Sequence, residues 1–276
     1  MSKSPTISFI GAGNMASAII GGMLDSGYKA ASIWASAPDD QHLQALRRQF
    51  GISVTTDNRH CAEQASIIIL AVKPQVMKTV CQALAPVVQN TRPLIISIAA
   101  GLESSTLDQW LGGGLPLIRV MPNTPSLVGK GAAGLYANAA ASQDQRLAAE
   151  AIFQSIGSAL WVEEEAQLHA VTALSGSGPA YFFLMLEALE AAAMGHGISQ
   201  DTARQLAIQT MAGAAEMARR SSLEPAQLKR NVMSPGGTTE RAIHCFEEKG
   251  LRTLVNDAYT AALMRSQEMA KDLAAD

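Results

Sequence analysis

Short apolar runs alternate with longer amphipathic segments along roughly the first 160 residues of the chain. A strand that is covered on both faces shows little polar alternation, so nearly continuous apolar runs predict buried strands. These runs are residues 6–10, 32–35, 67–72, 94–99 and 117–120. The segments with helical periodicity between them are residues 14–26, 41–50, 75–84 and 106–111. Strands and helices in this order predict a parallel sheet with helices on both faces, the doubly wound α/β fold of the Rossmann type.

The pattern changes near residue 160, where strand-like runs give way to long helical segments rich in Ala, Leu and Met. These segments are residues 180–194, 201–220, 242–249 and 254–273. Their apolar stripes are wide for one isolated layer, so we expect an all-helical dimerisation domain that is buried against a second copy of the chain. A self-contained helical bundle is the alternative. The predicted domains are residues 1–162 and residues 163–276.

The composition is that of a folded protein with an apolar interior. Of the 276 residues, 48% are hydrophobic and 16% are charged, which excludes general disorder and fits roughly two domains. The net charge is −3 and Lys and Arg form no cluster, so we expect neither nucleic acid nor an anionic membrane as a partner. The most apolar run, residues 67–72, is far shorter than the ~20 residues of a membrane span.

Cysteine usage predicts a reducing, cytoplasmic environment. Cys61, Cys81 and Cys245 are scattered, odd in number and outside any metal-ligand spacing, so we expect free thiols and no metal site. The strand-like run that begins at residue 6 leaves no room before it for the apolar segment of a signal peptide, which favours the same compartment.

A glycine-rich turn follows the first apolar run and opens the first helix. Its sequence is Gly11-Ala12-Gly13-Asn14-Met15-Ala16. Gly11 permits the tight turn, and Gly13 has no side chain to keep a pyrophosphate from the backbone and the positive end of the helix. Ala16 meets the third requirement, which is close packing of helix on strand. With a strand before it and a helix after it, this turn predicts dinucleotide binding.

The end of the second predicted strand favours NADPH over NADH. An NAD site usually has Asp or Glu there to accept from the ribose 2′-OH, whereas this strand ends at Ser36 and the next acid is Asp39. Hydroxyl and backbone donors suit a 2′-phosphate, and a carboxylate repels it. Ser36, with Asn58 and Arg59 from the next loop, is the predicted 2′-phosphate environment.

Further candidate residues lie where other predicted strands end. The carboxyl ends of parallel strands border the ligand crevice in such sheets, so we expect Lys73 near the cofactor phosphates or ribose. Small residues at 97–101 leave space for a nicotinamide ring. The segments at this edge are Ala71-Val72-Lys73-Pro74, Ser97-Ile98-Ala99-Ala100-Gly101 and Met121-Pro122-Asn123-Thr124-Pro125.

Two glycine-rich passages interrupt the helical half, and each precedes a predicted helix. They are residues 174–181, with the sequence LSGSGPAY, and residues 234–240, with the sequence SPGGTTE. Both expose backbone N–H groups and hydroxyls at a helix N-terminus, where an anion is stabilised without a charged side chain. Ordinary interhelical turns are the alternative interpretation.

These motifs together resemble pyrroline-5-carboxylate reductases over essentially the whole chain. The fourth of the following motifs is highly specific to that family, and their order and spacing also agree. They are Phe9-Ile-Gly-Ala-Gly-Asn-Met15, Leu70-Ala-Val-Lys-Pro-Gln75, Met121-Pro-Asn-Thr-Pro125, Ala170-Val-Thr-Ala-Leu-Ser-Gly-Ser-Gly-Pro-Ala-Tyr181 and Ser234-Pro-Gly-Gly-Thr-Thr239. The resemblance implies reduction of 1-pyrroline-5-carboxylate to L-proline, the last step of proline biosynthesis, with NADPH or alternatively NADH. It also implies a helical domain that interlocks in a dimer, and in some members dimers assemble into decamers.

The same resemblance implies the site residues. Glu165 lies at a family position near the substrate, although the run of Glu163 to Glu165 leaves the register open, and Ala37 stands where some members have a second Ser. The implied cofactor residues are Gly11, Ala12, Gly13, Asn14, Met15, Ser36, Asn58, Ala71, Val72, Lys73, Pro74, Ala99 and Asn231. The implied substrate residues, presented by the partner subunit, are Ser234, Gly236, Gly237, Thr238 and Thr239.

Our mechanistic hypothesis gives the hydride chemistry to the nicotinamide and leaves orientation and electrostatics to the protein. Gly236, Gly237 and Thr239 donate hydrogen bonds to the substrate carboxylate, and the Thr239 hydroxyl lies beside the imine nitrogen as hydrogen-bond partner or proton relay. No catalytic histidine is expected, because His169 and His244 fall in helical segments as packing or surface residues.

Two other functions are open to a protein of this pattern. A β-hydroxyacid dehydrogenase also joins a Rossmann half to a helical half, but it usually needs a Lys base, and residues 175–181 contain none. A non-catalytic NADPH sensor that uses the helical domain for partner binding is the other alternative. Turnover of pyrroline-5-carboxylate separates all three.

Overall fold

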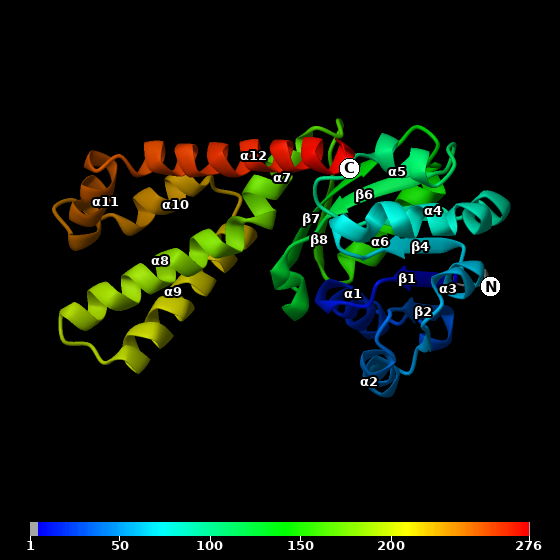
Figure 1. Ribbon diagram of the computed structural model, residues 1–276. Coiled ribbons are helices and arrows are strands. Elements are labelled where there is room, and N and C mark those ends of the chain that lie inside the picture. The colour runs from blue at the N-terminus through cyan, green and yellow to red at the C-terminus, as the bar shows by residue number, and fades with distance from the viewer. Residues whose placement is uncertain (1–4, 276) are drawn as a thin grey trace. The chain divides into compact units, whose positions relative to one another are not determined.

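The computed structural model describes residues 5–275 and is built around an eight-stranded sheet (Figure 1). The strand order is β3-β2-β1-β4-β5-β6-β7-β8, and its first six strands have the order of a Rossmann fold. The strands are β1 (Ile7–Ile10), β2 (Ile33–Ser36), β3 (Ser53–Thr55), β4 (Ile67–Leu70), β5 (Leu94–Ser97), β6 (Leu117–Met121), β7 (Gly131–Ala137) and β8 (Gly157–Trp161). The predicted doubly wound fold is therefore confirmed.

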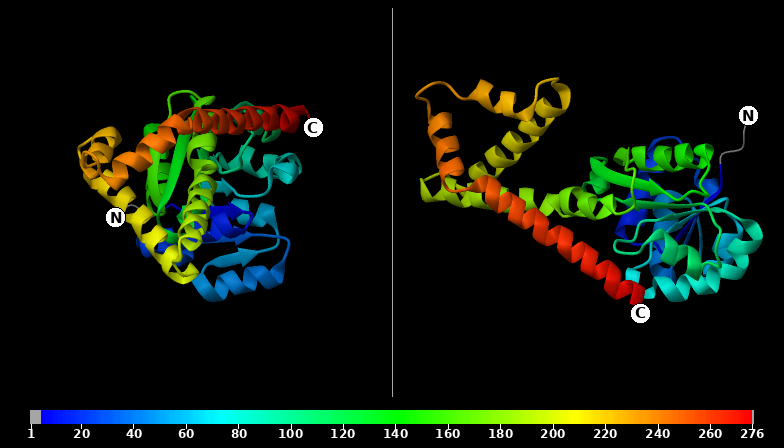
Figure 2. Two further views of the ribbon diagram at one scale, coloured as in Figure 1. Left: turned by 90° about the vertical axis from the view of Figure 1, so that its left-hand side faces the viewer. Right: turned by 90° about the horizontal axis from the view of Figure 1, so that it is seen from above.

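Helices lie on both sides of this sheet (Figure 2), and alternate side chains of the strands supply the two cores. Ile7 and Phe9 of β1 belong to the core with α1, α2 and α6, whereas Ile10 belongs to the core with α3, α4 and α5. The helices are α1 (Asn14–Asp25), α2 (Asp40–Phe50), α3 (Asn58–Glu63), α4 (Pro74–Thr91), α5 (Ser104–Trp110), α6 (Gln143–Gln154) and α7 (Gln167–Val171). Short 3₁₀ turns precede two of the strands, η1 (Ala30–Ser32) before β2 and η2 (Thr124–Val128) before β7.

One edge of the sheet departs from the predicted parallel arrangement. Strand β7 pairs antiparallel with β6, and β8 then pairs parallel with β7. The sequence hides these strands because close packing requires glycine in them. A Cβ on Gly157 would lie 2.0 Å from the Gly131 carbonyl oxygen, and one on Gly134 would lie 2.7 Å from Val171. Strands with such residues lack the β-branched and aromatic signal that predicts a strand.

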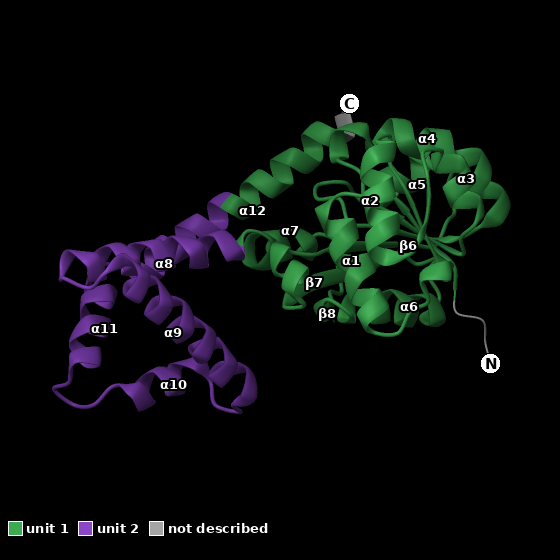
Figure 3. Ribbon diagram, turned by 90° about the horizontal axis from the view of Figure 1, so that it is seen from below, with its two compact units in different colours: residues 1–177, 262–276 green, residues 178–261 purple. Residues whose placement is uncertain are grey.

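The chain divides into two compact units (Figure 3). Unit 1 comprises residues 1–177 and 262–276, and unit 2 comprises residues 178–261. This division by compactness differs from the predicted boundary at residue 162, because α7, the π-helical turn η3 (Thr172–Gly176) and the end of the last helix all belong to unit 1. The functional domains 1–162 and 163–276 stay a prediction.

Unit 2 is helical, as predicted, and leaves most of its apolar side chains uncovered. Among residues 178–261, Ala203 is the one hydrophobic residue that is buried, whereas Phe182, Phe183 and Leu184 are each more than 60% exposed. A self-contained bundle would bury such side chains, so this alternative does not fit. The helices are α8 (Gly178–Gly195), α9 (Gln200–Arg220), α10 (Pro225–Val232), α11 (Thr238–Glu248) and α12 (Leu251–Ala275), whose last residues belong to unit 1. Over residues 5–275, none of the helices is both long and apolar enough for a membrane span.

Candidate active site

The glycine turn between β1 and α1 has the shape that the sequence analysis expects. Gly11 has a φ of +100°, and a Cβ there would lie 2.6 Å from the Ala71 carbonyl oxygen, so only glycine fits without a backbone shift. Gly13 is exposed, a Cβ on it would meet nothing within 4 Å, and no side chain caps the helix that it begins. No N-cap side chain therefore occupies the first N–H groups of this 12-residue helix.

Register brings the other predicted strand ends to the same edge. Ile10 pairs with Leu70, and Leu70 pairs with Ser97, so the residues that follow each strand are neighbours. The Ala71 N–H donates to the Ile10 carbonyl at 2.8 Å, which fixes the segment Ala71 to Pro74 beside the glycine turn. Lys73 is exposed and precedes Pro74, the first residue of α4, and Ala99 lies nearly buried beyond β5.

His42 is a contact of the glycine turn that the sequence analysis missed. Its Nε2 lies 2.6 Å from the Ala12 carbonyl oxygen, and because a carbonyl only accepts, Nε2 carries the hydrogen. The Ala12 carbonyl and the Gly13 N–H belong to one trans peptide plane and point in opposite directions. The bond from His42 therefore fixes the direction in which the Gly13 N–H points. No local motif indicates this contact, which joins residues 30 positions apart.

Two of the residues predicted to surround a 2′-phosphate, Ser36 and Asn58, are hydrogen-bonded to each other. Ser36 is fully buried, and its hydroxyl donates to Asn58 Oδ1 at 2.8 Å. Asn58 is half-buried and keeps its amide N–H groups as donors. Arg59 is exposed, with Nε donating to the Ala83 carbonyl at 3.0 Å. Asp39 is used as the cap of α2, where it accepts from the His42 N–H.

Of the three consecutive glutamates, Glu165 is the one held by Ser104 and Arg119. It accepts from the Ser104 N–H at 2.5 Å and from the Ser104 hydroxyl at 2.6 Å, and it forms an ion pair of 2.9 Å with Arg119. Glu163 and Glu164 are exposed. Glu165 thereby joins the start of α5 to β6.

The sequence analysis missed Arg119. An arginine inside the buried strand Leu117–Met121 indicates that a partner of opposite charge lies nearby, so the signal was present in the sequence. Its side chain is 6% exposed. His169 belongs to the same neighbourhood: burial and the Arg119 charge lower its pKa, and its Nδ1 lies 2.9 Å from the Ser266 hydroxyl. His169 is thus a packing residue, as expected, and His244 is exposed on α11.

The motif at residues 170–181 contains a π-helical turn, η3 (Thr172–Gly176), directly before α8. Asn123 from the loop after β6 donates to the Ser175 carbonyl at 3.0 Å and accepts from the Ala132 N–H at 2.9 Å. A Cβ on Gly176 would lie 2.7 Å from the Met121 side chain. π-Helical turns are frequent at functional sites, and here the turn is tied to the loop at the sheet edge.

The loop Ser234–Thr239 lies in unit 2 and begins α11. Gly236 has a φ of +71°, and its N–H donates to Glu240 Oε2 at 2.7 Å. The Gly237 N–H donates to the Ser234 carbonyl at 2.9 Å. Two of the donors that our hypothesis assigns to the substrate carboxylate therefore have partners within the chain, one in the loop and one on α11. Thr238 is exposed and Thr239 is half-buried.

Asn231, the implied cofactor residue of the helical half, lies on α10. It is exposed, and its Oδ1 accepts from Gln227 Nε2 at 2.8 Å. Its side chain amide is therefore held by a neighbour on the same helix. A role in cofactor binding stays a prediction.

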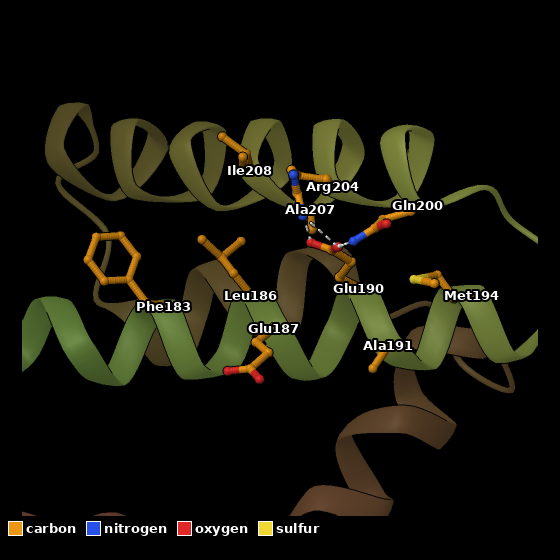
Figure 4. Close-up of a pocket in the computed structure, with 10 residues that line it drawn as sticks. All are labelled: Phe183, Leu186, Glu187, Glu190, Ala191, Met194, Gln200, Arg204, Ala207 and Ile208. Atoms are coloured by element: carbon orange, nitrogen blue, oxygen red, sulfur yellow. Dashed lines mark hydrogen bonds and ion pairs between the residues drawn. The ribbon is translucent and has the colours of Figure 1, made fainter.

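A separate pocket of about 490 Å³ lies between α8 and α9 (Figure 4). Apolar side chains line most of it, and Glu190 on its wall accepts from Gln200 and from Arg204. The hydrogen bond from Arg204 lowers the pKa of Glu190. None of the predicted site residues lines this pocket, which belongs to the uncovered apolar surface of unit 2.

The two buried cysteines have raised thiol pKa values. Burial raises the pKa of the Cys61 thiol to about 11 and that of Cys81 to about 12, so both are protonated at neutral pH. Within the part of the chain that the structure describes, no group of three His, Cys, Asp or Glu residues is placed to bind a metal.

Comparison with known proteins agrees with this geometry. Residues 165–269 match the family model "Pyrroline-5-carboxylate reductase dimerisation", and residues 6–101 match "NADP oxidoreductase coenzyme F420-dependent". The pyrroline-5-carboxylate reductase of Pseudomonas aeruginosa is 48% identical over 271 residues, which are 98% of this chain and 99% of that protein. The chain belongs to the pyrroline-5-carboxylate reductase family.

Other members of the family support the assignment. The pyrroline-5-carboxylate reductase of Vibrio alginolyticus is 42% identical over 96% of this chain and 97% of its own. Among solved structures, the Coxiella burnetii reductase has a TM-score of 0.94 at 42% identity, covering 97% of this chain and 99% of that one. The Plasmodium falciparum reductase, solved with NADP bound, has a TM-score of 0.85 at 30% identity, covering 97% and 98%. Family membership excludes the β-hydroxyacid dehydrogenase alternative.

Proposed function

We propose that this chain reduces 1-pyrroline-5-carboxylate to L-proline with NADPH, the last step of proline biosynthesis. The observation that carries the proposal is the exposed, uncapped start of α1 at Gly13, set beside the ends of β4 and β5. This edge fits a dinucleotide, and the family to which the chain belongs acts on a cyclic imine.

The proposed cofactor site combines the glycine turn with the neighbouring strand ends. The N–H groups that follow Gly13 bind the pyrophosphate, and His42 holds the Ala12–Gly13 peptide in the required direction. Ser36 acts through Asn58, whose amide N–H groups face the 2′-phosphate, because the Ser36 hydroxyl itself is buried. The remaining members are Asn14, Met15, Ala71, Val72, Lys73, Pro74, Ala99 and Asn231. This donor set favours NADPH, with NADH as the weaker cofactor.

The proposed substrate site is the loop Ser234–Thr239, presented by the partner subunit, together with Glu165. The carboxylate of the imine binds at the N-terminus of α11, where backbone N–H groups and the helix dipole favour a negative charge. Glu165 positions the start of α5 through its bonds to Ser104.

Thr239 is the proposed hydrogen-bond partner of the ring nitrogen. The bound reduced nicotinamide supplies a hydride to the C=N carbon. A proton on the imine nitrogen makes that carbon a better acceptor, and the Thr239 hydroxyl either donates it or holds the protonated nitrogen in place. The nitrogen ends as the secondary amine of proline, so one hydride and one proton balance the reaction.

We further propose that the active form is a homodimer in the cytoplasm. The uncovered apolar surface of unit 2 and the match to a dimerisation family support self-association, and three free cysteines support a reducing compartment. Assembly of dimers into decamers stays a prediction, and light scattering coupled to size exclusion tests it.

One assay tests the proposed activity. Oxidation of NADPH by the purified protein is followed with pyrroline-5-carboxylate, and the reverse direction is followed with NADP⁺ and 3-hydroxyisobutyrate-type acids. We expect turnover with the imine alone and a higher kcat/KM for NADPH than for NADH. Binding of NADPH without turnover of any substrate would favour the sensor alternative instead.

A further inference from the structure

The anion site at the start of α11 already has an anionic partner within the chain. The Gly236 N–H donates to Glu240 Oε2 at 2.7 Å, and Glu240 stands in the first turn of α11. A hydrogen bond to a carboxylate is roughly twice as strong as one between neutral groups. The same N–H is one of the donors that our mechanism gives to the substrate carboxylate. Two carboxylates therefore compete for it.

We propose that Glu240 is a specificity-determining residue, which occupies the anion site of the loop until the carboxylate of the substrate displaces it. This proposal rests on the proposed function. A backbone N–H has one hydrogen to donate, and two carboxylates that share one donor repel each other. Binding of the substrate therefore requires the Glu240 side chain to leave Gly236. A ring compound without a carboxylate gains no bond from this exchange and leaves Glu240 in place.

The geometry differs from ordinary helix capping. In a capping box the Glu at the third helical position accepts from the N–H of the N-cap residue. Here the N-cap is Gly237, and its N–H donates to the Ser234 carbonyl instead. Glu240 reaches one residue further back, to Gly236, which is exposed. The two roles predict opposite effects of removing the Glu240 charge. If Glu240 only caps the helix, its loss destabilises the loop. If Glu240 occupies the anion site, its loss frees the Gly236 N–H for the substrate carboxylate.

The decisive variant is Glu240→Gln, which keeps the size and one acceptor oxygen but removes the charge. We expect the dissociation constant for L-proline, measured by calorimetry on the full-length protein with NADP⁺ present, to fall about three- to tenfold, the size of one like-charge contact at the dielectric constant of bulk water. Affinity for L-prolinamide, which has no carboxylate, is expected to stay unchanged. The KM for pyrroline-5-carboxylate is expected to fall by a similar factor.

Glu248→Gln is the matched control, because Glu248 is exposed near the other end of the same helix and the variant loses the same charge. We expect it to bind proline as the wild type does. Weaker or unchanged proline binding in Glu240→Gln overturns the proposal, and so does an equal gain for prolinamide.

A second measurement separates this proposal from the proposed function. The Gly236 amide resonance is followed by NMR while acetate is added to the wild type and to Glu240→Gln. We expect the acetate-dependent shift to reach half its maximum at a lower concentration in the variant. Unchanged acetate binding rejects the role of Glu240, whether or not the protein reduces pyrroline-5-carboxylate. Absence of that turnover in the wild type rejects the proposed function alone.

Discussion

We assign the same task, the binding of an anion at a helix N-terminus, to the two glycine-rich loops of this reductase, and the two loops differ in how ready they are for it. The turn at Gly11 is fixed by its neighbours: the Ala71 backbone excludes a side chain, and His42 holds the Ala12 carbonyl. The loop at Gly236 has open space around it and binds a carboxylate of its own chain. On our proposals, the first loop binds its anion without rearrangement, whereas the second exchanges one partner for another.

The strongest test of the fixed loop compares two glycines two positions apart. Gly11→Ala forces a Cβ to within 2.6 Å of a backbone oxygen at a φ of +100°, and we expect a loss of at least ~3 kcal/mol in the free energy of unfolding. Gly13→Ala meets no atom within 4 Å, so its stability should change by less than ~1 kcal/mol while NADPH affinity falls. Urea denaturation and NADPH titration of both variants measure this. Equal stability losses would contradict the idea that the two glycines serve different purposes.

The ion pair of Arg119 and Glu165 tests the stability of the unit that carries the glycine turn at Gly11. Arg119→Ala leaves a largely buried carboxylate that keeps only Ser104 as partner, and we expect a loss of ~3 kcal/mol in stability. Arg265→Ala is the control, because Arg265 forms only exposed ion pairs and should cost under ~1 kcal/mol. Chemical denaturation compares the two. A loss no larger than the control would show that Glu165 finds another partner.

Thr239 tests the chemistry that the second loop serves. Thr239→Ala is expected to lower kcat/KM for pyrroline-5-carboxylate by up to ~10², the lower end of the range for a positioned proton donor. NADPH affinity should not change. Thr238→Ala, at the exposed neighbour, should have the smaller effect. Steady-state kinetics of both variants decide the matter, and unaltered kinetics in Thr239→Ala would remove Thr239 from the mechanism.

His42 gives the smallest expected effect. His42→Ala removes one hydrogen bond to the Ala12 carbonyl, and a net loss of ~1 kcal/mol in cofactor binding corresponds to about a fivefold weaker NADPH complex. His42→Gln, which retains an N–H donor, should restore part of the affinity. His60→Ala provides the control from an exposed histidine of α3. NADPH affinity that is unchanged in His42→Ala would show that the turn keeps its shape without this contact.

Local signals in the sequence predicted the parts of the fold and site that depend on neighbours along the chain. The glycine turn after β1 is such a part, since its meaning comes from the strand before it and the helix after it. The ends of β4 and β5 were predicted for the same reason. The helices of unit 2 also follow from local composition.

The sequence analysis missed features that depend on contacts between positions far apart in the chain. The role of Glu165 depends on Arg119 and Ser104, which are 46 and 61 positions away. Strands β7 and β8 contain glycines at positions where a side chain would clash with a neighbouring element. Such clashes can be identified only once the strands are paired. The bond from Glu240 to Gly236 spans four positions, yet the motif gives no sign of it, because the same residues suit an external anion equally well.

Most apolar side chains of unit 2 are exposed in a single chain, so we expect folding of this unit to depend on association of two chains. With Ala203 as the one buried hydrophobic residue among positions 178–261, unit 2 of a single copy lacks the interior that offsets the lost chain entropy. The melting temperature should therefore rise with protein concentration, and specific activity should decline on dilution. The amount of chain that a cell makes then sets both how much enzyme it has and what fraction of it is folded.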